Sequence, residues 1–449
     1  MLTRRNWAWL RPMRAIMATA VFVEGVRMAG NNAVGAGLIE SRLPPAWVDV
    51  LRSAGRLAMD KGQALYLVGG VVRDLLLGRP VVDLDLVVEG DAVALARQLA
   101  QQSGGRARTH PRFGTAKVEL ADWSADLATA RSETYAYPGA LPEVAPGTMA
   151  QDLGRRDFTI NALAFHLAPS RFGELLDPHG GLADLKAGLV RVLHAKSFVD
   201  DATRILRALR YEQRLGFRLE PATEALVRRH ARMLDTISGD RVRHEFELIF
   251  QEGGPEAVLA CAEELQVLAI VSPGMRAGHL GPALGRARDA LGPAGLTSGL
   301  CFLFLAYPLS EAQMETFVRR LRFPAKLARS LRELPRLKVL LSVLEAPDVS
   351  AGALYHSLQP FSAQALLALS LVLEPGLAQE RVRLYLERLC YVKTELDGDA
   401  LMQMGVRPGP GLGKLLRALL DARLEGTVAS RQQEEQFVRR WMAQRREGA

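Results

Sequence analysis

Two aspartates lie two residues apart in an apolar run that closely follows a pair of glycines. The glycines are Gly69 and Gly70, and the aspartates are Asp83 and Asp85. Polar and apolar residues alternate over residues 82–86, which predicts a strand with both carboxylates on one face. Two carboxylates on one face repel each other unless a cation lies between them. A pair of Mg²⁺ ions is the usual solution, and two such ions can clamp an in-line phosphoryl displacement.

The glycine pair ends one apolar run, and Arg73 and Asp74 open the next. Glycines before a helix let backbone N–H groups approach a triphosphate closely. We therefore expect Gly69, Gly70, Arg73 and Asp74 to contact a nucleotide. A glycine turn followed by an edge strand with solvated aspartates is the simpler alternative. The glycines, the Arg-Asp pair and the two aspartates together favour nucleotidyl transfer over that alternative.

A second cluster occupies residues 151–162, with the sequence QDLGRRDFTINA. Arg155 and Arg156 offer forked donors for phosphates, and Asp157 and Asn161 can hold a ribose hydroxyl. The alternative is a charged helix N-terminus with Asp157 as the N-cap and Phe158 buried. That alternative does not explain two adjacent arginines.

A third cluster occupies residues 198–211, where the spacing predicts one helix with an apolar arc. Asp201, Arg204, Arg207 and Tyr211 share the opposite side. Asp201 and Arg204 are three residues apart and would be neighbours on a helix. The Asp201 carboxylate can accept a hydrogen bond from an exocyclic amine, and the Arg204 guanidinium can donate one to a ring nitrogen. Cytosine and adenine both present that amine and nitrogen. An ordinary surface salt bridge between them is the alternative.

These clusters, in this order, resemble the motifs of the class II tRNA nucleotidyltransferase and bacterial poly(A) polymerase family. The resemblance covers residues 60–250 and implies an α+β fold: a polymerase-β-like head with a mixed sheet, then an all-α neck, body and tail. It also implies that Asp201 and Arg204 act as a protein template for the incoming base, with Arg207 as a further nucleotide contact. The chain has Asp200 where the family motif has glutamate.

Two further segments fit this resemblance. Residues 176–186 resemble the connection from head to neck, and residues 237–245 resemble a supporting helix start capped by Ser238 or Asp240. Asp126, within residues 124–129, is either a third carboxylate near the metals or a solvated strand residue.

The chain divides into a mixed front and a helical rear. Strands are expected at residues 64–68, 81–88, 116–120 and 125–129, and helical periodicity dominates from about residue 182. We expect a variable N-terminal extension (1–44), a head (45–168), a neck (169–260) and a tRNA-binding body and tail (261–449). The apolar stretch 7–26 is interrupted by charges and is not expected to span a membrane.

Composition agrees with an anionic partner. The 449 residues carry a formal net charge of +8, and three widely spaced cysteines indicate reduced thiols in a cytoplasmic protein. The expected activity is addition or repair of the tRNA 3′-CCA end from CTP and ATP with two Mg²⁺ ions, with no membrane or protein partner. Residues 131–143 look most like the subgroup that adds only the terminal A. A poly(A) polymerase and a non-catalytic RNA-binding protein are the alternatives.

Overall fold

The computed structural model describes residues 31–120 and 123–446, so the apolar stretch 7–26 lies outside the described residues. The chain forms two compact units, residues 1–270 and residues 271–449. The first unit holds the sheet and the helices of the expected head and neck. Among the described residues, no helix is long and apolar enough to cross a membrane.

The core of the first unit is a mixed seven-stranded sheet in the order β3-β4-β5-β2-β1-β8-β9. β2 and β5 run parallel, and the other neighbouring pairs are antiparallel. The strands are β1 (Ala64–Val68), β2 (Leu84–Glu89), β3 (Arg106–His110), β4 (Thr115–Glu119), β5 (Ser124–Thr129), β8 (Ala164–His166) and β9 (Leu175–Leu176). The sequence predicted four of these strands, three of them to within one residue at each end.

The second predicted strand was placed too early. β2 begins at Leu84, and Asp83 lies in a bend just before it. The first residue of β2 is also where pairing with β5 begins, opposite Ala125, so no neighbouring strand supports an extended backbone before that point. The alternation survives, since Leu84 and Leu86 are buried while Asp83 and Asp85 are exposed.

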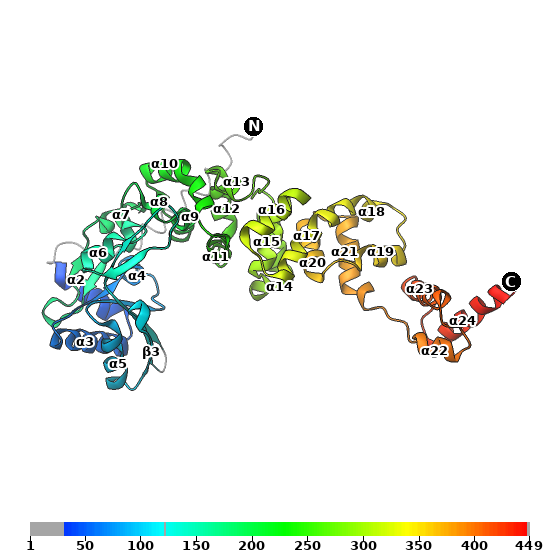
Figure 1. Cartoon of the computed structure of the whole chain (residues 1–449), viewed down its shortest axis with the longest axis horizontal. Helices are drawn as coiled ribbons and strands as arrows, with labels where there is room; N and C mark the ends of the chain where they lie inside the picture. The colour runs from blue at the N-terminus through cyan, green and yellow to red at the C-terminus, as the bar shows by residue number, and fades with distance from the viewer. Residues whose placement is uncertain (1–30, 121–122, 447–449) are drawn as a thin grey trace. The chain divides into compact units, whose positions relative to one another are not determined.

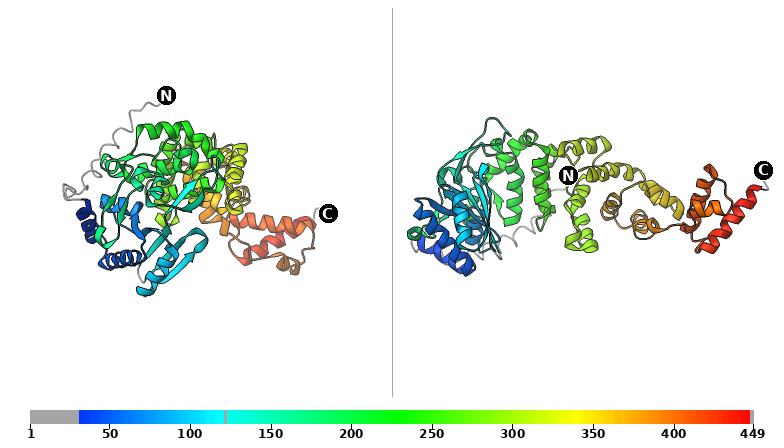
Figure 2. Two further views of the ribbon diagram at one scale, coloured as in Figure 1. Left: turned by 60° about the vertical axis from the view of Figure 1, so that its left-hand side comes forward. Right: turned by 60° about the horizontal axis from the view of Figure 1, so that its bottom comes forward.

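Two layers of helices and loops cover the sheet. α3 (Pro45–Asp60) and α5 (Ala92–Gln102) contact each other and pack against the strands (Figure 1; Figure 2, blue helices beside cyan strands). An apolar cluster joins Tyr66 and Val87 of the strands to Leu153 of α6 (Met149–Gly154). Buried apolar residues on both sides fix the sheet between these layers.

The expected extension 1–44 is partly an integral element of the head. Residues Asn31–Arg42 form α2, which contacts β9 and α4 (Gly70–Leu77). Ile39 is fully buried, and Gly35 lies so close to Gly173 that a Cβ there would be 1.9 Å from the Gly173 carbonyl oxygen. The head sheet also continues to Leu176, beyond the boundary expected at residue 168.

The rest of the first unit is mainly helical. The amphipathic pattern of residues 205–209 is confirmed, since Ile205, Leu206 and Leu209 are fully buried. The helices are α7 (Gly181–Ala187), α8 (Ser197–Asp200), α9 (Thr203–Leu215), α10 (Pro221–His230), η5 (Ala231–Thr236), α11 (Gly239–Phe250), α12 (Pro255–Glu264) and α13 (Val267–Val271). Two short strands, β10 (Leu189–Val190) and β11 (Arg218–Leu219), pair within this region.

The second unit is built of helices throughout its described residues, 271–446. One apolar cluster joins residues 337–424, and a second, smaller one joins residues 396–442. Its helices are α14 (Leu280–Gly295), α15 (Ser298–Ala306), α16 (Glu311–Leu321), α17 (Ala325–Val339), α18 (Leu341–Glu345), α19 (Ala351–Leu358), α20 (Ala363–Val372), α21 (Leu377–Glu387), α22 (Gly398–Gln403), α23 (Pro410–Leu424) and α24 (Arg431–Arg446).

Candidate active site

The turn between β1 and α4 depends on a glycine. Gly69 has φ +71°, a conformation that side chains with a Cβ rarely adopt, and it serves as the N-cap of α4. Its N–H donates to the Leu163 carbonyl at 2.9 Å. A Cβ on Gly69 would lie 2.4 Å from the Arg156 Nη1. The turn therefore lies directly beside the Arg156 guanidinium.

Sheet pairing brings a second carboxylate beside Asp85. Asp126 of β5 lies directly opposite Asp85 of β2, and Lys117 of β4 lies opposite Asp126. The Lys117 Nζ donates to the Asp126 carboxylate at 3.3 Å. Lys117 was not among the expected site residues, because only the register of three strands places it there.

The Asp85 carboxylate reaches the surface, yet many protein atoms surround it. This loss of water is the largest cause of its raised pKa, and the negative charge of Asp126 is the next. Arg156 lowers the pKa, while Asp83 raises it further. These interactions place Asp83, Asp126 and Arg156 around Asp85.

The carboxylates have the chemistry of a divalent cation site. Among the residues that the structure describes, no three histidine, cysteine, aspartate or glutamate side chains lie close enough to form a metal site. The oxygen ligands of Asp85, Asp126 and Asp83 are nevertheless those that Mg²⁺ prefers. The mutual repulsion that raises the Asp85 pKa is the imbalance that a bound cation would relieve.

Arg73 is committed to interactions inside the protein. Its side chain is 3% exposed and donates to both oxygens of Asp74, at 2.9 and 2.8 Å. Its Nη1 donates to the Asn161 Oδ1 at 2.6 Å. Arg73 and Asp74, both expected nucleotide contacts, therefore hold α4 to the second cluster.

Asp157 and Asn161 form the next part of this network. The Asp157 Oδ1 accepts from the Asn161 Nδ2 and from the Phe158 backbone N–H, each at 2.9 Å. Its Oδ2 accepts from the Arg207 Nη2 at 2.6 Å. Burial alone would raise the Asp157 pKa, but Arg207 and the hydrogen bonds hold it below its usual value. Asp157 is not the N-cap of an α-helix, although Phe158 is fully buried as the sequence predicted.

Two buried carboxylates hold the arginine pair. Asp152, fully buried in α6, accepts from Arg155 at 2.7 Å and from Arg156 at 3.0 Å. Glu133 accepts from the Arg155 Nη1 at 2.9 Å and from the Tyr135 hydroxyl at 3.0 Å. Burial, followed by the Glu133 charge, raises the Tyr135 pKa to about 12. Asp152, Glu133 and Tyr135 were missed because nothing in the local sequence distinguishes them.

Glu133 lies on a separate two-stranded ribbon. The ribbon pairs β6 (Arg131–Thr134) with β7 (Glu143–Pro146). At its tip, a Cβ on Gly139 would lie 2.5 Å from the Thr236 Oγ1 at the end of η5. The ribbon thus extends from the head to the neck within the first unit.

The prediction that Asp201 and Arg204 share one helix is wrong. α8 ends at Asp200, Asp201 has extended backbone angles (φ −140°, ψ 103°), and α9 begins at Thr203. The Asp201 Oδ1 accepts from the Thr203 backbone N–H and Oγ1, at 2.9 and 2.7 Å, and this side-chain bonding breaks the helix. It also accepts from the Arg241 Nη2 at 2.8 Å.

Asp201 and Arg204 also do not form the surface salt bridge that was the alternative. Among the ion pairs of the described residues, Asp201 pairs with Arg241. Arg204 is buried and donates to the Arg155 carbonyl at 2.7 Å. Each member of the pair is thus bound to groups other than its predicted partner.

The caps expected near residue 238 are only partly present. Ser238 occupies the N-cap position of α11, but its side chain makes no capping hydrogen bond. Asp240 lies in the first turn and pairs with Arg243 at 3.0 Å.

Residues 155–157 connect the three clusters. Arg156 adjoins Gly69 and acts on Asp85, the Arg155 carbonyl binds Arg204, and Asp157 binds Arg207. The structure therefore brings the carboxylate edge, the glycine turn and the expected base-reading arginine, Arg204, around one segment.

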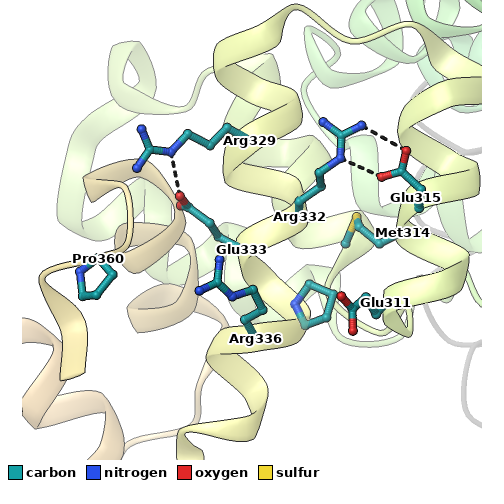
Figure 3. Close-up of a pocket in the computed structure, with 9 residues that line it drawn as sticks. Glu311, Met314, Glu315, Arg329, Arg332, Glu333, Arg336 and Pro360 are labelled. Atoms are coloured by element: carbon teal, nitrogen blue, oxygen red, sulfur yellow. Dashed lines mark hydrogen bonds and ion pairs between the residues drawn. The ribbon is translucent and has the colours of Figure 1, made fainter.

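A cavity in the second unit has a different character. Arginines from α17 and glutamates from α16 line it (Figure 3). Arg332 pairs with Glu315 at 2.6 Å, and Arg329 pairs with Glu333 at 2.9 Å. Glu333 also accepts from the Ser362 N–H before α20. The Arg332–Glu315 pair joins α17 to α16, whereas the Arg329–Glu333 pair lies within α17.

Comparisons with known protein families match both parts of the first unit. The model of the poly A polymerase head domain matches residues 65–191. The model described as "probable RNA and SrmB-binding site of polymerase A" matches residues 216–278.

Three relatives span most of the chain. An A-adding tRNA nucleotidyltransferase of Halalkalibacterium halodurans is 33% identical, over 87% of this chain and 92% of the relative. A CC-adding tRNA nucleotidyltransferase of Deinococcus radiodurans is 34% identical, over 88% and 93%. An A-adding tRNA nucleotidyltransferase of Geobacter sulfurreducens is 34% identical over 88% of this chain, but the chain spans only 47% of that longer relative.

Solved structures agree with this likeness. A CCA-adding enzyme in apo form II has a TM-score of 0.77 and 30% identity, covering 91% of this chain and 98% of that one. The Thermotoga maritima CCA-adding enzyme complexed with tRNA-CCA has a TM-score of 0.71 and 29% identity, with the same coverage.

Proposed function

Because the chain belongs to the tRNA nucleotidyltransferase and poly(A) polymerase family, we propose that it adds nucleotides to the 3′ end of tRNA without a nucleic-acid template. The substrates are ATP, CTP or both. One observation carries this proposal: residues 155–157 join the Asp85 edge, the Gly69 turn and the Arg204 region into one site. Phosphate chemistry and base selection can therefore act on the same nucleotide.

The reaction joins RNA to a nucleoside triphosphate. The 3′-hydroxyl oxygen of the tRNA forms a bond to the α-phosphorus of the triphosphate. The bond between the α-phosphorus and the oxygen that bridges to the β-phosphate breaks. The hydroxyl proton is lost and pyrophosphate leaves. Arg156, held by Asp152 beside Gly69, is placed to donate to the phosphates.

Asp83, Asp85 and Asp126 would hold divalent cations at this edge. Bound Mg²⁺ would favour ionisation of the attacking hydroxyl and balance the charge of the leaving pyrophosphate. The protein supplies the oxygen ligands, and Lys117 balances part of the charge of Asp126.

Base selection is assigned to Asp201 and Arg204. The Asp201 carboxylate accepts from an exocyclic amine, and the Arg204 guanidinium donates to a ring nitrogen. Adenine and cytosine present that combination, whereas guanine and uracil do not. Arg73, Asp74, Asp157, Asn161 and Arg207 hold the two halves of the site together through the buried hydrogen bonds described above.

Addition of only the terminal A is the more specific proposal. Two of the relatives are named A-adding enzymes, and residues 131–143 resemble that subgroup. The ribbon formed there contacts Arg155 through Glu133, next to the proposed base-reading site. A poly(A) polymerase shares the head model, but a solved neighbour that is complexed with tRNA favours a tRNA substrate.

The test uses purified protein and tRNAs that lack one, two or three terminal nucleotides. With Mg²⁺, ATP is expected to be incorporated into tRNA ending in CC, and chelation of the metal is expected to stop the reaction. Efficient incorporation of CTP into tRNA lacking all three nucleotides would contradict the A-only proposal. Failure to incorporate any nucleotide into any of the tRNAs would contradict the tRNA-directed activity, and poly(A) synthesis on unrelated RNA would favour the alternative.

A further inference from the structure

One serine contacts both members of the proposed base-reading pair. Ser197, the first residue of α8, is fully buried. Its Oγ accepts a hydrogen bond from the Arg204 Nη1 at 2.9 Å. Its backbone carbonyl accepts from the Asp201 N–H at 3.2 Å. No feature of the sequence had distinguished this residue.

Ser197 is one of two acceptors that fix the Arg204 guanidinium. The second is the Arg155 carbonyl, which accepts from Nη2 at 2.7 Å. A planar guanidinium bonded through both terminal nitrogens cannot rotate about its stem without losing one of these bonds. Among the hydrogen bonds of the described residues, none uses the Arg204 Nε–H. The two acceptors thus set the plane of the guanidinium without using all of its donors.

The two acceptors come from different elements. Ser197 lies on α8 of the neck, whereas Arg155 lies in the head segment that also carries Arg156. The orientation of Arg204 therefore depends on both. Without the Ser197 hydroxyl, the Arg204 guanidinium would keep only the hydrogen bond from Nη2 to the Arg155 carbonyl. It could then pivot about that remaining bond.

We propose that Ser197 is a positioning residue for nucleotide selection, which orients Arg204 through its buried hydroxyl. This inference rests on the proposed function, since it concerns how the base-reading pair discriminates. A base edge is read by the angle and distance of its hydrogen bonds, so a guanidinium that pivots accepts more than one edge. Ser197 does not itself contact the nucleotide.

The test compares correct and incorrect nucleotides in Ser197→Ala. The substrate is tRNA ending in CC, with ATP against GTP and UTP, and kcat and KM are measured separately. We expect the preference for ATP to fall about 10-fold, mostly through a higher KM for ATP, because one charge-assisted hydrogen bond is lost. Ser330→Ala is the matched control: it also removes a buried hydroxyl, in α17 of the second unit, and is expected to leave the preference unchanged.

A double variant tests whether the effect passes through Arg204. If Ser197 acts by orienting this arginine, adding Ser197→Ala to Arg204→Ala changes the preference no further. Ser197→Cys, which is similar in size and a weaker acceptor, is measured alongside and is expected to lie between wild type and Ser197→Ala. The cysteine variant also serves if the alanine variant does not fold.

The outcomes separate this inference from the proposed function. If the wild-type protein adds nucleotides but both serine variants keep its full preference, the positioning role is wrong and the proposed function stands. Additive losses in the double variant would likewise contradict it. If the wild-type protein adds no nucleotide to any tRNA, both proposals are wrong.

Discussion

At the level of single residues, the site contains charges that the folded protein tolerates only at a cost. Asp85 is flanked by Asp83 and Asp126, and its raised pKa reflects lost water and this repulsion. A group whose pKa is raised on folding contributes stability below its ordinary pKa, and that contribution is lost as the pH rises. The ionised Asp85 therefore destabilises the metal-free protein at neutral pH, which is typical of residues retained for function.

Replacing Asp85 with asparagine should separate activity from stability. In Asp85→Asn we expect nucleotide addition to fall at least about 1,000-fold, since a proposed metal ligand is lost. Without metal, the midpoint of thermal unfolding should rise by about 1–2 °C, a small gain because the group is exposed. Calorimetry with and without Mg²⁺ and an incorporation assay measure both effects. Asp49→Asn, an exposed acid on α3, is the control, and near-normal activity of Asp85→Asn would disprove the metal assignment.

The pKa of Asp157 is shifted in the opposite direction from that of Asp85. Its pKa is lowered on folding, so it contributes stability above its ordinary pKa of about 3.9, and this contribution is lost as the pH falls through the folded value. We expect Asp157→Asn to lower the free energy of unfolding by about 2–4 kcal/mol at pH 7, because Arg207 loses a buried partner.

Urea unfolding at pH 7, 5 and 3.5 measures this difference. The gap in unfolding free energy between Asp157→Asn and wild type should narrow at the lowest pH. The carboxylate of the unfolded chain takes up a proton there, whereas the folded carboxylate, whose pKa is lowered, stays ionised to lower pH. Glu224→Gln, which removes an exposed pair with Arg228, should change stability by less than about 0.5 kcal/mol. If the difference in unfolding free energy does not change with pH, the charge of Asp157 is not the cause of the lost stability.

At the level of elements, the β1–α4 turn and the β6–β7 ribbon place the arginines. Gly69 combines a positive φ with direct contact to Arg156, whereas Gly62 has a similar φ of +67° and open space around it. Comparing these two glycines separates backbone strain from displacement of the arginine.

We expect Gly62→Ala to destabilise the protein by about 1–2 kcal/mol and Gly69→Ala to destabilise it more. Both force a side chain to a positive φ, but the ψ of −126° at Gly69 also lies outside the left-handed helical region. Only Gly69→Ala should also lose activity, because its Cβ would displace the Arg156 guanidinium. Thermal unfolding and kcat for incorporation are measured on both variants. Equal activity in the two would show that the contact with Arg156 does not matter for the reaction.

The ribbon is tested at Glu133. This carboxylate accepts from Arg131, Arg155 and Tyr135, and Arg155 in turn binds Arg204 through its carbonyl. We expect Glu133→Ala to lower kcat about 10- to 100-fold and to weaken the choice of nucleotide, as three partly buried donors lose their shared acceptor. Glu143→Ala, an exposed residue of the other strand, is the control. If Glu133→Ala keeps the normal choice of nucleotide, the β6–β7 ribbon does not contribute to base selection.

At the level of the whole molecule, the net charge of +8 favours binding to nucleic acid that weakens with salt. The boundary between the two compact units, at residues 270 and 271, is the place to divide the chain. A cut near residue 350 would instead divide one apolar cluster, which contains Leu344 on one side and Leu354 on the other.

A protein that ends near Ser272 should keep the head and neck and lose the second unit. We expect the Kd for tRNA to rise at least about 10-fold and its salt dependence to become shallower, because phosphate contacts are removed. At saturating tRNA, kcat should change little, since the proposed site lies within the first unit. Filter binding over a range of salt concentrations measures the effect, and unchanged affinity would show that the second unit has another role.

Local periodicity determined much of the fold. Three strands and the apolar arc of α9 were predicted because alternation and helical spacing are properties of neighbouring residues. Spacing also identified the glycine turn. It failed at Asp201, where the side chain of Asp201 captures the Thr203 N–H and ends the expected continuous helix. That competition between side chain and backbone is too close in energy to be read from periodicity.

Tertiary structure alone decided the partners of the site residues. Strand register placed Asp126 and Lys117 beside Asp85, and Arg73 binds Asn161 across 88 residues of sequence. Arg204 binds a carbonyl 49 residues away and Arg207 a carboxylate 50 residues away. The sequence shows which chemical groups are present and which neighbours share a face. Which group each arginine binds depends on contacts between distant segments, because only the packed core brings those segments within hydrogen-bonding distance.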